Sequence, residues 1–115
     1  MHELSIAMAI AEAAAEEAGR NGNARVAKVY LKLGQMVGVV KSSLFASYEM
    51  AAEMCDLAGS ELVIDEVPVA AFCPKCQLSR PVVSLQEIRC SECGTPTPDI
   101  TAGRELEVTA IEIFQ

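Results

Sequence analysis

The sequence predicts an α+β fold, in which a small mixed three-stranded sheet with two packed helices carries an inserted four-cysteine zinc-ribbon module. Three observations lead to this prediction. Residues 4–18 have apolar side chains at helical spacing, and residues 25–33 alternate between apolar and polar side chains, as a strand with one wet face does. Two Cys-x-x-Cys pairs, Cys73/Cys76 and Cys90/Cys93, are separated by thirteen residues, a spacing typical of a tetrahedral zinc site.

The composition is that of a single folded domain. The chain has 115 residues, of which 51% are hydrophobic and 22% charged, and it lacks an uninterrupted apolar run of membrane-spanning length. The first nineteen residues contain Glu3, Glu12, Glu16 and Glu17 and have no positively charged start, so they do not resemble a signal peptide. We therefore expect a cytoplasmic protein that does not bind a membrane.

The charge balance argues against nucleic-acid binding. The formal net charge is −7 and the nine basic residues are scattered, whereas a phosphate-binding surface needs a basic patch. Three of these cations, Lys75, Arg80 and Arg89, lie close in sequence to the cysteines. We interpret them as partial neutralisation of an anionic zinc centre.

The first predicted helix, residues 4–18, is dominated by alanine, the best helix former, and Gly19 suits its C-terminal end. Leu4, Met8, Ala11 and Ala15 have the spacing of one apolar face. The other face also holds apolar residues, so we expect the helix to pack closely against a sheet, with an acidic edge toward water; these residues are Ile6, Ala9, Ile10 and Ala13, and the edge is Glu12, Glu16 and Glu17. In the strand that follows, Ala27, Val29, Leu31 and Leu33 are expected to face inward, and Lys28, Tyr30 and Lys32 outward.

Gly34 and Gly38 are expected to bracket a flexible connection. Such a hinge is compatible with segment exchange between two copies, so a homodimer stays open. A second helix is expected from an N-cap at Ser42 or Ser43 to about Ala58, closed by Gly59. Its expected buried stripe is Leu44, Phe45, Tyr48, Ala51, Ala52, Cys55 and Leu57.

Two helical methionines, Met50 and Met54, are interpreted as core residues, and Cys55 as a buried small hydrophobe rather than a ligand or nucleophile. Runs rich in Val and Ile at residues 61–71 and 104–114 are expected to be strands, with Pro68 marking an edge or a bulge. They flank the cysteines and are expected to lie antiparallel, as two legs of the module.

The expected organisation is thus an α/β domain of residues 1–71 plus 100–115 and a zinc-binding module of residues 72–99, which cannot bury enough apolar surface to fold without its metal. Two other readings of the cysteines are a pair of disulfides and redox-active dithiols. A closed all-thiolate site keeps no open position for water, so we expect a structural zinc and no enzyme.

The single histidine is His2, and a solvated terminal residue is its simplest interpretation. The position also allows chelation. The Met1 α-amine with the backbone nitrogen and imidazole of His2 can close adjacent rings around one metal, and Glu3 can complete a square plane through its backbone nitrogen or carboxylate. Nitrogen donors in this geometry favour Ni(II) or Cu(II) over zinc.

Several motifs together resemble those of the HypA/HybF family of hydrogenase-maturation nickel metallochaperones. They are Met1-His2-Glu3, Ser43-Leu44-Phe45 with Tyr48-Glu49, and Cys73-x-x-Cys76 with Cys90-x-x-Cys93-Gly94. The resemblance implies nickel binding through the N-terminal segment, with His2 essential, and a separate structural zinc on the four cysteines. It further implies delivery of Ni(II) to the [NiFe]-hydrogenase large subunit together with a HypB-like GTPase.

One departure from the resemblance concerns the residues beside the cysteine pairs. Some members of the family carry histidines there, associated with pH-dependent exchange of zinc ligands and with urease maturation, but Gln77 and Gly94 occupy those positions here. Hydrogenase maturation is therefore the better expectation. The alternatives from other classes are a zinc-ribbon interaction or nucleic-acid-binding module without nickel transfer, and a dithiol oxidoreductase.

Overall fold

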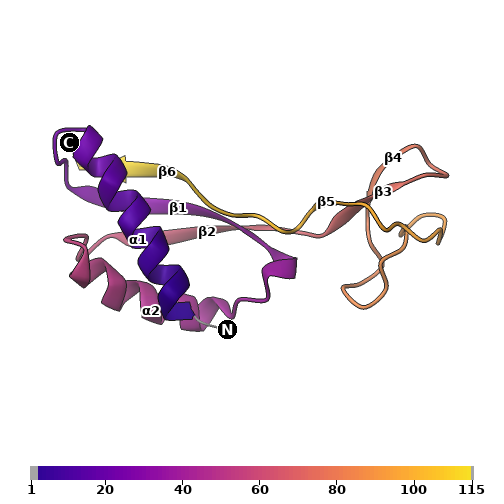
Figure 1. Cartoon of the computed structure of the whole chain (residues 1–115), viewed down its shortest axis with the longest axis horizontal. Coiled ribbons are helices and arrows are strands. Elements are labelled where there is room, and N and C mark those ends of the chain that lie inside the picture. The colour runs from indigo at the N-terminus through magenta and orange to yellow at the C-terminus, as the bar shows by residue number, and fades with distance from the viewer. Residues whose placement is uncertain (1–2, 115) are drawn as a thin grey trace. The chain divides into compact units, whose positions relative to one another are not determined.

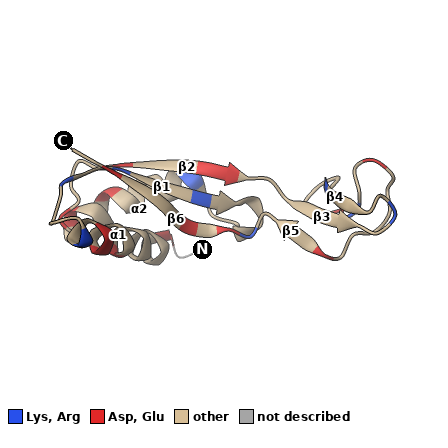
Figure 2. Cartoon of the chain, turned by 90° about the horizontal axis from the view of Figure 1, so that it is seen from above, with Lys and Arg blue, Asp and Glu red and all other residues tan. Residues whose placement is uncertain are grey.

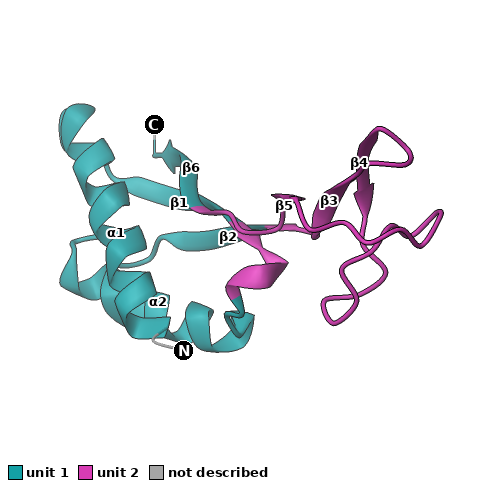
Figure 3. Ribbon diagram, turned by 45° about the vertical axis from the view of Figure 1, so that its right-hand side comes forward, with its two compact units in different colours: residues 1–32, 38–65, 107–115 teal, residues 33–37, 66–106 magenta. Residues whose placement is uncertain are grey.

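The computed structural model describes residues 3–114, arranged as two helices, a short 3-10 helix and two small sheets (Figure 1). The chain divides into two compact units (Figure 3). Unit 1 comprises Met1–Lys32, Gly38–Asp65 and Glu107–Gln115, and unit 2 comprises Leu33–Val37 and Glu66–Leu106. Each unit is described by itself below.

Unit 1 has two layers, a three-stranded sheet and a pair of helices that cover one face of it (Figure 2). The helices are α1 (Glu3–Arg20) and α2 (Lys41–Met54), and the strands are β1 (Val26–Gly34), β2 (Glu61–Val67) and β6 (Leu106–Ile113), in the order β2-β1-β6. The backbone N–H of Phe114 donates to Arg25 O and that of Gly34 to Glu105 O, so β6 runs antiparallel to β1. The predicted three-stranded sheet with two packed helices is confirmed.

The buried stripe of α1 differs from the predicted one. Leu4 is exposed and Met8 and Ala15 are only half-buried, so of the four predicted positions Ala11 alone is buried. The predicted and the observed stripe both have helical spacing. The observed one consists mostly of alanine and faces α2, which allows the two helices to approach closely. The residues buried are Ala7, Ile10, Ala11, Ala14 and Ala18.

The core side of α2 is formed by Leu44, Tyr48, Ala51 and Ala52, as predicted, with Leu57 buried just after the helix. Three predictions about its other side chains are wrong. Phe45 is 42% exposed, Met50 56% and Met54 69%, because all three lie on the flanks or outer face of the helix. Cys55, the C-cap residue, is only partly buried, and burial, Glu12 and Asp56 raise the pKa of its thiol.

The start of α2 also differs from the prediction. Its N-cap is Val40, in extended conformation and without a side-chain cap, so neither Ser42 nor Ser43 caps the helix. The strand β1 follows its predicted pattern from Lys28 on: Val29, Leu31 and Leu33 are buried, and Lys28, Tyr30 and Lys32 are half-exposed. At its start the prediction is wrong, because Val26 is buried and Ala27 is only half-buried.

The connection after β1 is exposed but tied down by hydrogen bonds. It forms a 3-10 helix, Gln35–Val37, whose Met36 N–H donates to Gly103 O at 2.8 Å, while Gln35 Oε1 accepts from the Val69 N–H at 3.3 Å. A Cβ on Gly34 would lie 2.2 Å from the carbonyl carbon of Gly103, so only glycine fits. We call this contact region of unit 2, residues 33–37, 69 and 103–105, the clasp.

The remainder of unit 2 is built on a second three-stranded sheet of β3 (Ala70–Cys73), β4 (Leu78–Pro81) and β5 (Ile100–Ala102), in the order β4-β3-β5. Pro68 separates β2 from β3, so the predicted strand at 61–71 is two strands in different sheets. The predicted legs, residues 61–71 and 104–114, are not neighbours in the unit 1 sheet, because β1 lies between β2 and β6. In the second sheet the strands that lead into and out of the cysteine region, β3 and β5, do pair directly. Unit 2 includes the whole predicted module of residues 72–99 and extends it by residues 33–37, 66–71 and 100–106, all of which were expected in the α/β domain.

Within the described residues 3–114, neither helix combines the length and apolar character that crossing a membrane requires.

Candidate metal centre

Each Cys-x-x-Cys pair lies in a tight turn of the same construction. In the first, at the tip of the β3–β4 hairpin, the Gln77 N–H donates to Cys73 O at 2.8 Å; in the second, the Gly94 N–H donates to Cys90 O at 2.9 Å. Gln77 and Gly94 both have left-handed backbones, with φ of 60° and 74°. The residue after each pair thus closes the turn that aims both thiols the same way.

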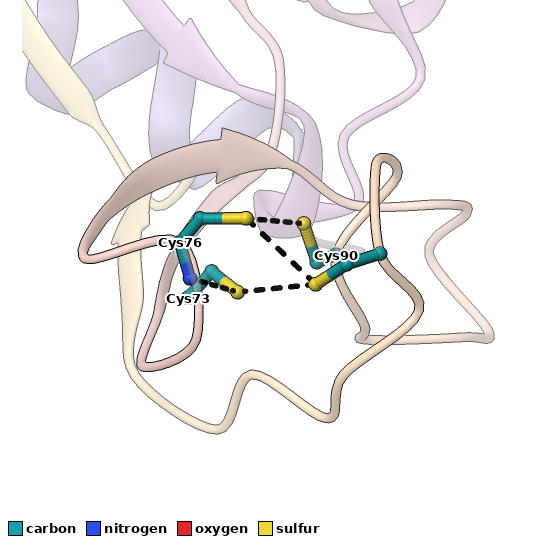
Figure 4. Close-up of side chains that lie close together, drawn as sticks. Cys73, Cys76 and Cys90 are labelled. Carbon is teal, nitrogen blue, oxygen red and sulfur yellow. Dashed lines mark hydrogen bonds between the residues drawn. The ribbon is translucent and has the colours of Figure 1, made fainter.

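The two turns are held against each other by backbone pairing. Val82 and Cys90 form an antiparallel bridge, and the Ser91 N–H donates to Pro81 O at 3.2 Å. A further bridge, between Arg89 and Pro96, closes the base of the second turn. The pairing between the turns brings cysteines from distant parts of the sequence together, and Figure 4 shows Cys73, Cys76 and Cys90 converging on one point.

The four cysteine sulfurs have the spacing that a tetrahedral zinc ion requires. All four Sγ atoms lie within 4.8 Å of one another, and the separations are 3.5 Å for Cys73–Cys93, 3.9 Å for Cys76–Cys90 and 3.7 Å for Cys76–Cys93. Zn–S bonds of about 2.3 Å place tetrahedral sulfurs about 3.8 Å apart. A disulfide needs about 2.05 Å, and all four cysteines are free. The donor set therefore fits a zinc ion.

Three of the four sulfurs have a backbone N–H or a hydroxyl group within hydrogen-bond distance. Cys73 Sγ accepts from the Cys76 N–H at 3.3 Å, Cys90 Sγ accepts from the Glu92 N–H at 3.4 Å, and Cys93 Sγ lies 3.2 Å from Thr95 Oγ1. Hydrogen bonds from Thr95 lower the pKa of the Cys93 thiol to about 6. Backbone and hydroxyl donors thus favour the thiolate form that metal binding requires.

Cys76 differs from the other three cysteines. Its contact with the Cys73 thiol raises the pKa of Cys76 to about 11, while Arg80 acts in the opposite direction. The cluster is closed on the side of Cys73 and Cys90, which are buried, and open at Cys93, which is exposed. Thr95 and the two turn-closing residues are supporting parts of the site that spacing alone did not predict.

The predicted nickel ligands fall largely outside the described residues. Met1 and His2 are not among residues 3–114, and Glu3, the third predicted ligand, is the first described residue of α1 and is partly exposed. A carboxylate is favoured at this positive end of the helix. The structure therefore brings together the four predicted zinc ligands and describes one of the three predicted nickel ligands.

Unit 1 has a groove of about 710 Å³ between the C-terminal part of α1 and β6. Its rim includes Glu16 and Glu17, which form exposed ion pairs with Arg20 at 2.6 and 2.8 Å. The acidic edge predicted for the first helix is thus partly neutralised within the same helix (Figure 2). Such exposed pairs contribute little to stability.

The fold and the cysteine cluster define a metal-binding protein of the α+β class, with a small two-layer unit and a separate four-cysteine metal module. Residues 1–113 match the family model described as "Hydrogenase/urease nickel incorporation, metallochaperone, hypA". The chain therefore belongs to the HypA family.

Curated relatives and solved structures agree with this assignment. The "Hydrogenase maturation factor HypA" of Chloroflexus aurantiacus is 44% identical over 112 residues, which are 97% of this chain and 98% of the relative. The protein of the same name from Desulfosudis oleivorans is 40% identical, with 98% of each chain covered. The solution structure of the nickel metallochaperone HypA from Helicobacter pylori shares the fold, with a TM-score of 0.64, 21% identity, and 98% of this chain and 97% of that one covered.

Proposed function

We propose that this chain carries Ni(II) on its N-terminal segment and delivers it for [NiFe]-hydrogenase maturation, while the four cysteines hold a structural zinc ion. The nickel ligands are the Met1 α-amine, His2 and Glu3, and the zinc ligands are Cys73, Cys76, Cys90 and Cys93. The observation that supports this proposal most strongly is the match to a nickel-incorporation family over residues 1–113, which includes the Met-His-Glu segment.

The donor chemistry of the two sites explains why they hold different metals. Amine, amide and imidazole nitrogens in a plane favour Ni(II), whereas four thiolates at tetrahedral spacing favour zinc. A terminal site with few ligands also exchanges its metal more readily than a closed thiolate cluster does. The nickel is therefore transferable cargo and the zinc is structural.

The division of the chain follows these two roles. The nickel-binding role belongs to the α/β domain of residues 1–71 and 100–115. The zinc-binding role belongs to the module of residues 72–99, which lies within the wider unit 2 of residues 33–37 and 66–106. The partners are a HypB-like GTPase and the large subunit of a [NiFe]-hydrogenase. Hydrogenase is preferred over urease because the relatives at 44% and 40% identity are hydrogenase maturation factors, and because Gln77 and Gly94 follow the cysteine pairs instead of histidine.

The nickel site is tested by titrating Ni(II) into the zinc-loaded protein with its native N-terminus. We expect one Ni(II) per chain with a square-planar absorption band, and release in acid, because protonation of the imidazole near pH 6.5 and of the amine near pH 8 removes two donors. His2→Ala and a version with one glycine added before Met1 should both bind nickel at least tenfold more weakly.

Zinc content serves as the matched control in this experiment. Both variants should keep one zinc per chain and an unchanged circular dichroism spectrum, because neither change touches the cysteines. Unchanged nickel affinity in the extended version would show that the terminal amine is not a ligand. Unchanged affinity in His2→Ala would refute the proposed site.

A further inference from the structure

The zinc module contains one cation whose side chain turns toward the sulfurs. Three basic residues, Lys75, Arg80 and Arg89, lie close in sequence to the cysteines. Arg89 donates to Glu87 Oε2 from two of its nitrogens, at 2.6 and 3.0 Å, so it is engaged by a carboxylate, and Lys75 is exposed. Only Arg80 has a buried guanidinium nitrogen, Nε, that makes no hydrogen bond within the described part of the chain.

The register of the β3–β4 hairpin explains why Arg80 reaches the cluster. Arg80 on β4 lies opposite Ala71 on β3, and Leu78 lies opposite Cys73. Residues opposite each other in an antiparallel pair share a face, and so do residues two apart on one strand. Arg80 therefore projects from the face of the hairpin that bears Cys73, and both Ala71 and Cys73 on this face are buried.

The neighbours of Arg80 are thiols and a carboxylate. Its guanidinium lies beside the Cys76 thiol, and Glu92 and Cys90 are its other ionisable neighbours. Arginine stays charged at all physiological pH values, so Arg80 contacts the cysteines as a cation.

Within the described chain, Cys76 is the cysteine of the cluster that lacks a backbone or hydroxyl hydrogen-bond donor. Cys73 and Cys90 each accept from a backbone N–H, and Cys93 pairs with the Thr95 hydroxyl. Among residues 3–114, no backbone N–H or hydroxyl reaches Cys76 Sγ. Four thiolates on one Zn²⁺ also leave two net negative charges in a partly buried site, which a nearby guanidinium offsets.

We propose that Arg80 is the positioning residue of the zinc centre: its guanidinium donates to the zinc-bound Cys76 thiolate and supplies the countercharge for the cluster. The inference rests on the zinc occupancy proposed above. Hydrogen bonding withdraws electron density from a metal-bound thiolate, so the Cys76 sulfur becomes less nucleophilic and less easily protonated. Arg80 thereby keeps Cys76 on the metal.

The test compares Arg80→Gln with Arg89→Gln, each as the full zinc-loaded chain. Both variants lose one positive charge near the cysteines, but only the first loses the contact with sulfur. The proteins are treated with iodoacetamide, whose iodide the thiolate sulfur displaces, and the modified cysteine is identified by mass spectrometry. We expect Cys76 in Arg80→Gln to react with iodoacetamide about tenfold faster than in wild type. Zinc transfer to a chelator should accelerate by a similar factor, since losing a charge-assisted hydrogen bond changes an equilibrium or rate about tenfold or more. Arg89→Gln should match wild type.

The distribution of the label over the four cysteines separates a specific role from a structural one. Equal reactivity of Cys76 in the two variants, or a uniform increase at all four cysteines, would overturn the proposal. If Arg80→Gln does not retain zinc, Arg80→Lys takes its place, with faster labelling of Cys76 expected because lysine lacks the guanidinium fork. Wild-type labelling in Arg80→Lys would then overturn the proposal. Wild-type protein without zinc would refute the zinc assignment itself.

Discussion

Two buried hydroxyl groups illustrate how single residues are held in this fold. Tyr48 is 2% exposed, and its hydroxyl lies 2.7 Å from Ser60 Oγ, so it is buried with a partner. Burial raises the pKa of Tyr48, with the Ser60 hydrogen bond acting in the opposite direction. Thr97, in unit 2, is 1% exposed, and its Oγ1 makes no hydrogen bond within residues 3–114. A buried hydroxyl without a partner destabilises the folded state.

Replacing Thr97 with valine should therefore not destabilise unit 2. The Thr97→Val variant keeps the side-chain shape and removes the unpaired oxygen, so we expect an unchanged free energy of unfolding or an increase of up to about 1 kcal/mol. Thr97→Ala is the control, and it should lose about 1 kcal/mol or more because it leaves a cavity. Chemical denaturation of the zinc-loaded proteins measures both. A valine variant less stable than the alanine variant would mean that the hydroxyl has an ordered partner.

The identity of the site residues was predictable from sequence to different degrees. Two Cys-x-x-Cys pairs specify four ligands because the spacing itself is set by metal geometry. The supporting residues, Thr95 and Arg80, could not be told apart from their neighbours by sequence spacing. Arg80 was one of three nearby cations. The hairpin register places it on the face that bears Cys73, whereas the Arg89 guanidinium is bound to Glu87. Neighbours in space follow from tertiary structure, which local sequence patterns do not encode.

At the scale of elements, the helices and β1 were predictable because their side-chain periodicity is local. The clasp and the second sheet were not predictable, since β5 has three residues and pairs with β3 across about thirty positions of the chain. Pro68, predicted to mark an edge or a bulge, separates strands of two sheets. Burial on α1 was mispredicted for a related reason: in an alanine-rich helix, the partner helix decides which stripe is covered.

The clasp gives a prediction at this scale, because its closest contact involves only backbone atoms. A Cβ on Gly34 would meet the carbonyl carbon and oxygen of Gly103 at 2.2 Å and the Arg104 nitrogen at 2.6 Å. Backbone at such distances cannot rotate away as a side chain can, so Gly34→Ala should lower the free energy of unfolding by about 3 kcal/mol. Thermal unfolding of the zinc-loaded protein measures the loss.

Gly19→Ala is the matched control for this substitution. Gly19 lies near the end of α1, and a Cβ there would approach Asn23 Oδ1 no closer than 3.8 Å. Alanine favours the helix over glycine by up to about 1 kcal/mol, so this variant should be as stable as wild type or more stable. Similar losses in the two variants would show that the clasp is not tightly packed.

At the scale of the whole molecule, the two units have different sources of stability. Unit 1 buries a continuous set of apolar side chains from α1, α2 and β1, including Leu31, Leu44 and Tyr48. In unit 2 the buried set is small and includes two of the cysteines, while Leu78, Val83 and Leu85 are exposed. A structural zinc site contributes about 10–16 kcal/mol of apparent binding free energy in small peptides. The metal is therefore expected to decide whether unit 2 folds.

Removing zinc should consequently unfold unit 2 while unit 1 stays folded. With a chelator present, we expect amides of β3, β4 and β5 to exchange with solvent within the shortest labelling time, while those of α2 and Val29–Leu31 stay protected. The clasp should lose protection with unit 2, because the N–H groups of Gly34 and Met36 donate to Glu105 and Gly103. Hydrogen-exchange mass spectrometry resolves these segments, and restoring zinc is the control. Equal loss of protection in α2 and β3 would mean that zinc supports one cooperative unit. If the predicted pattern is observed, the order of residues 35–40, between β1 and α2, depends on zinc although these residues lie in the N-terminal half of the chain.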